Sequence, residues 1–91
     1  MSIASRRKAI DGIDAALLRL VARRVRTVQM LAREKAAAGI GLRDKAREKV
    51  VLARAGKLAR PPLQAKAARA VMAAVMAATR QSLQSNKGKR A

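Results

Sequence analysis

The clearest pattern in the sequence is a repeat of apolar and charged positions over residues 7–35. The repeat advances by three and four residues, which is typical of the seam of one long helix that packs against other helices. Charged side chains on a packed seam are costly unless they are paired or bind a ligand, so the cations on this seam predict an anion-binding site. The seam positions are Arg7, Ile10, Asp14, Leu17, Val21, Arg24, Val28, Leu31 and Lys35.

The spacing of the seam cations predicts how they are shared between chains. A helix rises about 1.5 Å per residue, so Arg7 and Arg24 are on the order of 25 Å apart, too far for one small ligand to bridge. Arg24 and Lys35 are roughly 16 Å apart by the same rise, within reach of one metabolite-sized dianion. We therefore expect Arg24 and Lys35 to act from one subunit and Arg7 from a second, antiparallel copy in an interlocked homodimer.

Capping and breaking residues predict where the first two helices begin and end. The first helix is expected to start near Ser2 or Ser5, either of which can cap it, and to end near Ala38. Asp44 is a good N-cap for a second helix over residues 45–55.

A third helix completes the predicted all-α fold. Gly56 is expected to stop the second helix, and Pro61 and Pro62 to open the third, because proline is tolerated only in a first turn. We expect residues 1–86 to form one helical domain and residues 87–91 to form a basic, disordered tail.

Composition limits both the core and the chemistry. The chain has 91 residues and no Phe, Tyr or Trp, so one copy can bury little apolar surface, and dimerisation is the natural way to enlarge the core. Cysteine and histidine are absent, which excludes disulfides, thiol or histidine nucleophiles and ordinary zinc or haem sites. We expect neither a metal nor a cofactor.

The net charge of +17 is the main argument for a different class of function, a basic helical nucleic-acid-binding protein. The absence of aromatic side chains argues against a platform for single-stranded nucleic acid, which stacks bases on such rings. We expect at most nonspecific attraction of nucleic acid. No segment has the apolar length of a signal peptide or a membrane span, so the cytoplasm is the expected location.

Two groups of residues carry a family resemblance. The first is the string Arg7, Ile10, Asp11, Ile13, Asp14, Leu17, Leu18, Leu20, Arg24 and Lys35, and the second is Asp44, Arg47 and Glu48. Together they resemble the all-helical chorismate mutases, over roughly Ser5 to Gln84. The resemblance implies a long, a short and a long helix per chain, intertwined with a second copy as a six-helix bundle.

The resemblance also implies roles for individual residues. Arg24 and Lys35 would grip the substrate from one subunit, and Arg7 would reach in from the other. Glu48 would accept a hydrogen bond from the substrate hydroxyl. Asp44 and Arg47 would line the same pocket.

The third helix should supply a glutamine, and two registers compete for it. Counting from Lys35 without gaps places the family's glutamine on Gln84. Matching the apolar pattern instead places Leu83 there, with Thr79 at the preceding hydroxyl position. We assign Gln84, with Gln81 in reserve.

The implied reaction suits the available side chains. Chorismate is a dicarboxylate that rearranges to prephenate in one pericyclic step, with no nucleophile, metal or proton transfer, on the route to phenylalanine and tyrosine from the shikimate pathway. Arg7 and Arg24 would fix the carboxylates through bidentate contacts. Lys35 and Gln84 would donate to the ether oxygen, where negative charge builds as its bond to carbon breaks.

Two related activities stay open. Isochorismate pyruvate lyases share the fold, both arginines and the lysine, although the Asp44, Arg47 and Glu48 group looks more like the mutase pattern. A mutase of aminodeoxychorismate, the amino analogue of chorismate, is the other. A nucleic-acid-binding protein would instead gather its cations on an exposed face and bind in a strongly salt-dependent way.

Overall fold

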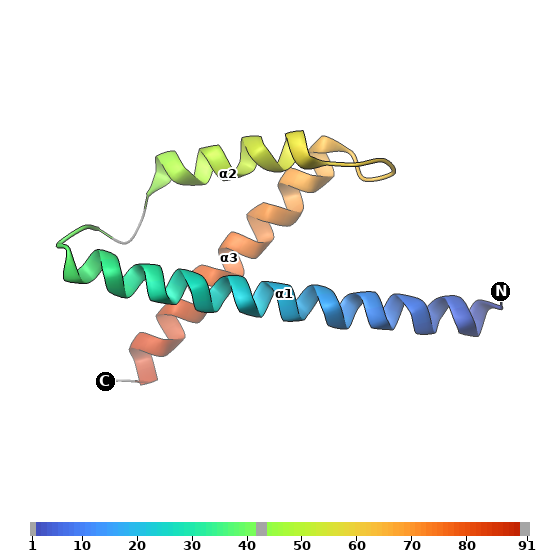
Figure 1. Cartoon of the computed structure of the whole chain (residues 1–91), viewed down its shortest axis with the longest axis horizontal. Coiled ribbons are helices and arrows are strands. Elements are labelled where there is room, and N and C mark those ends of the chain that lie inside the picture. Colours follow the sequence, from blue (N-terminus) through green and yellow to red (C-terminus); the bar gives the residue numbers. More distant parts are fainter. Residues whose placement is uncertain (1, 42–43, 90–91) are drawn as a thin grey trace.

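The protein folds as three α-helices joined by two short connections (Figure 1). The computed structural model describes residues 2–41 and 44–89, and the side chains of residues 2–41 and 44–84. The helices are α1 (Ile3–Ala37), α2 (Lys45–Leu58) and α3 (Ala65–Lys89), and the described residues include no strand. The predicted all-α class with a long, a short and a long helix is confirmed.

Helix α1 begins and ends where its capping residues predict. The hydroxyl of Ser2 accepts a hydrogen bond from the backbone N–H of Ser5 at 3.0 Å, which makes Ser2 the N-cap. At the other end, Ala38 donates its N–H to the carbonyl oxygen of Glu34. Gly39 follows with φ of 74°, a left-handed conformation that favours glycine and ends the helix.

Helix α2 starts at the predicted cap and continues past the predicted stop. The Asp44 carboxylate accepts a hydrogen bond from the N–H of Arg47 at 2.9 Å. The expectation that Gly56 ends the helix is wrong, because Gly56 stays helical and Leu58 is the last residue. A Cβ at Gly56 would lie 2.8 Å from Nη1 of Arg69 on α3, so the glycine allows a close approach between the two helices.

The expectation that Pro61 and Pro62 open the third helix is also wrong. Both lie in the turn before α3, and the N–H of Leu63 closes this turn on the carbonyl oxygen of Arg60 at 2.8 Å. A residue that precedes proline is driven away from the helical conformation, which keeps Pro61 outside a helix. Helix α3 starts only at Ala65.

The far end of α3 reaches into the segment expected to be a disordered tail. The helix includes residues 87–89, while residues 90 and 91 lie outside the described part of the chain.

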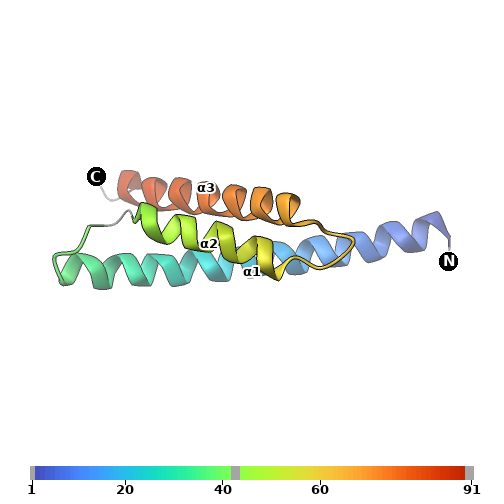
Figure 2. The ribbon, with the colours of Figure 1, turned by 90° about the horizontal axis from the view of Figure 1, so that it is seen from above.

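Helix α3 connects the other two helices. It packs along α2 and crosses α1, whereas α1 and α2 have no Cα pair within 8 Å in the described chain (Figure 1). Ala55, Ala68 and Thr79 are the only buried residues among those described. The molecule is elongated, 54 × 30 × 16 Å, and the N-terminal end of α1 extends past α2 and α3 (Figure 2).

Many large apolar side chains are exposed as a result. The most exposed on α1 include Ile3 at 72%, Ile13 at 66% and Leu18 at 67%. Among the described helices, none combines the length and apolar character needed to cross a membrane.

Candidate active site

Two of the cations on α1 differ from the others in burial. Arg24 and Lys35 are half-buried, on the same side of the helix as the half-buried Val21, Val28 and Ala32. The other described cations of α1 are exposed, and they are Arg6, Arg7, Lys8, Arg19, Arg23, Arg26 and Arg33. Since the two half-buried cations are about three turns apart, their long side chains lie over the same strip of the helix.

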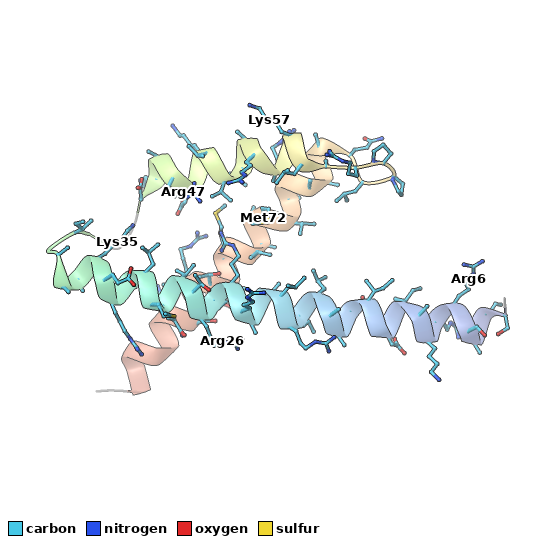
Figure 3. All side chains as sticks on the ribbon, viewed as in Figure 1. Arg6, Arg26, Lys35, Arg47, Lys57 and Met72 are labelled. Carbon is cyan, nitrogen blue, oxygen red and sulfur yellow. The ribbon has the colours of Figure 1, made fainter. Side chains whose placement is uncertain are left out.

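Helix α2 supplies the second predicted group. Figure 3 shows Lys35 of α1 and Arg47 of α2 on the sides of their helices that face each other. Arg47 and Asp44 are exposed, and Glu48 is half-buried. Because the Asp44 carboxylate caps α2, its cap position fixes the start of the helix that carries Arg47 and Glu48.

The structure adds one residue that the sequence did not indicate. Nη1 of Arg80 on α3 lies 3.5 Å from Oε1 of Glu48 on α2. The side chain of Glu48 is 27% exposed and that of Arg80 is 44% exposed, so the ion pair is partly screened from water. The one available signal was register, because Arg80 lies one turn before Gln84.

The other third-helix candidates lie in different surroundings. Gln84 is exposed, one turn beyond Arg80. Gln81 lines an open groove of about 620 Å³ between α1 and α3 together with Arg26, which Figure 3 places on the side of α1 away from α2. The structure therefore does not bring Gln81 together with Lys35.

Thr79 is buried, with 5% of its surface exposed, and its hydroxyl donates to the carbonyl oxygen of Val75 at 2.8 Å. Thr79 therefore donates its single hydroxyl proton to a carbonyl oxygen of its own helix.

Arg7 lies apart from all of these residues within one chain. It is exposed on the projecting N-terminal part of α1, about 25 Å along the helix from Arg24. Within one chain, Arg7 therefore lies away from both Arg24 and Lys35.

The chemistry open to these residues is electrostatic. All three helices carry cations that are candidates for the site, and Arg80 of α3 pairs with Glu48, the single half-buried carboxylate among the described residues. Guanidinium and ammonium groups suit a substrate that carries carboxylates, and a carboxylate suits a substrate hydroxyl.

The class of the protein follows from its all-helical fold and from a comparison of its sequence with known families. A sequence model of the family described as chorismate mutase type II matches residues 6–84, and the chain belongs to that family. Membership supports an isomerase activity of the chorismate mutase type at the level of the family. Comparison with curated proteins and with solved structures gives no significant match.

Proposed function

We propose that the protein is a homodimeric chorismate mutase that converts chorismate to prephenate for phenylalanine and tyrosine biosynthesis. The observation that carries the proposal is the half-burial of Arg24 and Lys35, alone among the described cations of α1, on one side of that helix. If these cations were only solvated surface charges, half-burial would not be expected at just these two positions, about three turns apart on one side of the helix. We also propose that the protein is cytoplasmic, as its sequence predicts.

The proposed reaction needs positioning and charge stabilisation only. Arg24 and Arg7 of the partner subunit hold the two substrate carboxylates, which keeps chorismate in the compact conformer that rearranges. Lys35 and Gln84 donate hydrogen bonds to the ether oxygen, which gains negative charge as the carbon–oxygen bond breaks. Because the new carbon–carbon bond forms in the same step, no intermediate has to be stabilised.

Residues of α2 complete the proposed pocket. Glu48 accepts a hydrogen bond from the substrate hydroxyl, and Arg47 adds positive charge on the side that faces α1. Asp44 holds the first turn of α2 through its hydrogen bond to the N–H of Arg47. Removal of this cap would misplace the residues that follow it.

The exposed apolar surface of α1 supports the homodimer. From Ser2 to Leu20 every residue is exposed except Ala16, which is half-buried. A single chain that leaves its longest helix uncovered has too small a core for independent stability. A second copy running antiparallel covers this surface and carries its own Arg7 toward Arg24 and Lys35.

Gln84 is our choice for the glutamine role because Gln81 lines the groove between α1 and α3, together with Arg26. Replacing Gln84 with Ala should lower kcat by about 10²-fold or more, the usual effect of losing one preorganised donor. The same replacement at Gln81 should lower kcat less than about tenfold. A larger loss at Gln81 than at Gln84 would reverse the assignment.

The experiment that tests the proposed function follows chorismate absorbance and identifies the product. Wild type should form prephenate, and Lys35→Ala and Arg24→Ala should each lower kcat/KM by about 10²-fold or more. Arg26→Ala is the matched control, because Arg26 is an exposed cation on the opposite side of the same helix, and it should stay within about threefold of wild type. Wild type that leaves chorismate unchanged would overturn the proposal, and release of pyruvate from isochorismate would identify the lyase instead.

A further inference from the structure

The open groove between α1 and α3 is a surface that one chain leaves unoccupied. Leu18 and Val25 of α1 line it with apolar surface, and Arg26 of α1 and Gln81 of α3 add polar groups. We propose that α1 of a second copy lies in this groove and that Asp11 of the partner subunit pairs there with Arg26. This inference rests on the homodimer of the proposed function and specifies how its two copies meet.

The groove continues the surface that one chain leaves uncovered. Leu18 is 67% exposed, and Val21 and Val25 in the same groove are only half-buried. The exposed N-terminal part of α1 runs to Leu20, so it overlaps the groove at Leu18. One partner helix can therefore cover both surfaces.

The register of the proposed dimer decides which part of the partner lies in the groove. Arg7 of the partner subunit has to reach Arg24 and Lys35, so it lies opposite a point about midway between them. Arg26 lies about one turn before that point on its helix. Because the two helices run antiparallel, Arg26 then lies opposite residues 10 and 11 of the partner, about one turn after the partner's Arg7.

Asp11 is the residue at this level that shares a side of α1 with the groove. It lies seven residues before Leu18 and fourteen before Val25, a spacing that keeps side chains on one side of a helix. Within the described part of one chain, neither Asp11 nor Arg26 has an ion-pair partner. By the same register, Leu18 lies opposite Leu18 of the partner subunit, so each covers the other.

The scarcity of acids makes the position of Asp11 informative. The chain has 22 lysines and arginines against 5 acids, so two copies repel each other overall. Such a dimer is favoured where an acid of one copy meets a cation of the other. Two-fold symmetry makes this contact twice, because Asp11 of each chain meets Arg26 of the other.

The test measures the dissociation constant of the dimer by sedimentation equilibrium in charge-reversal variants. Arg26→Glu and Asp11→Lys should each raise it by about tenfold, because each turns two attractions into two repulsions. The double variant exchanges the charges, keeps the net charge of wild type and should return to within about threefold of wild type. Concentrated salt should reduce all these differences. Arg26→Ala adds no repulsion, so it should raise the constant by less than about threefold and stay dimeric in the activity assay.

Arg23→Glu is the matched control. Arg23 is an exposed cation of the same helix, about one turn before Arg26, and it does not line the groove. Arg23→Glu changes the net charge as Arg26→Glu does, so it should leave the dissociation constant unchanged or lower it by relieving repulsion. An equal rise for Arg23→Glu, or no rise for Arg26→Glu, would overturn the inference.

Mixing Arg26→Glu with Asp11→Lys tests whether the pair joins different chains. In their heterodimer one contact is the wild-type pair, and the other brings the two introduced charges together as an attractive pair. Heterodimers should therefore exceed the roughly one half that random pairing gives, as counted by native mass spectrometry. A random proportion would overturn the inference and leave the mutase proposal intact, because that proposal is tested by chorismate turnover. Wild type that is monomeric at every concentration would overturn the homodimer, and this inference with it.

Discussion

The α2–α3 pair and the N-terminal half of α1 are both helical, but they are stabilised in different ways. All the buried side chains among the described residues lie on α2 and α3, where small residues let the two helices approach closely. Residues 3–20 of α1 have an apolar stripe that no other part of the described chain covers. Helices α2 and α3 thus pack within one chain, and the uncovered stripe of α1 supports the proposal that α1 packs against a second copy.

The largest expected effect comes from a charge placed in the uncovered stripe. Leu17 is 50% exposed in one chain, but the proposed dimer buries it. Leu17→Asp should therefore cost more than about 3 kcal/mol and dissociate the dimer, because a buried unpaired carboxylate is strongly unfavourable. Light scattering gives the molar mass, and urea unfolding gives the free energy.

Leu58→Asp is the control for that experiment. Leu58 is 61% exposed at the end of α2, and its replacement should change the free energy of unfolding by about 0.5 kcal/mol or less. Equal effects at Leu17 and Leu58 would contradict a dimer interface along α1.

An intermediate effect is expected where α2 meets α3. Ala68 is 8% exposed, so Ala68→Leu should overpack the contact and cost about 1 to 3 kcal/mol without changing the molar mass of the dimer. Ala36→Leu, at an exposed position of α1, should stay within about 0.5 kcal/mol of wild type. Loss of the dimer in Ala68→Leu would show that the two regions are not separate.

The smallest effect is expected at two glycines. No atom lies within 4 Å of a Cβ built on Gly12, so Gly12→Ala should stabilise the protein by about 0.5 to 1 kcal/mol through helix propensity alone. Gly56→Ala should stabilise it less, because Arg69 must move away from the new methyl group. Thermal unfolding measures both, and destabilisation by Gly12→Ala would mean that the partner's backbone packs against this glycine.

Local signals predicted much of this fold. Ser2 and Asp44 cap their helices as the sequence indicates, since a capping hydrogen bond joins residues three positions apart and is readable from spacing. Arg24 and Lys35 are half-buried as the seam periodicity indicates, together with Val21 and Val28, whereas the other five seam residues are exposed in one chain. Arg7 and the dimer stay predictions, because they concern a second chain.

Features that depend on contacts between helices were not predictable. Gly56 looked like a helix stop, but its use is to let Arg69 of α3 approach α2. Pro61 and Pro62 gave the right region for a break but not the right start for α3. The pairing of Arg80 with Glu48 joins residues 32 positions apart in the sequence, and no local spacing encodes it.

The central claim is an active site that two chains share, and subunit mixing tests it most directly. Arg7→Ala and Lys35→Ala should each be nearly inactive alone. In a heterodimer of the two, one site would combine the intact Lys35 of one chain with the intact Arg7 of the other, and the second site would lack both.

Refolding the two variants together in equal amounts should therefore restore prephenate formation to about one quarter of the wild-type rate, since about half of the random dimers are heterodimers with one active site of two. Each variant refolded alone should show no such recovery. Activity of the mixture equal to the average of the separate variants would contradict a shared site. Arg7 would then be an exposed surface residue that does not complete the site of the partner.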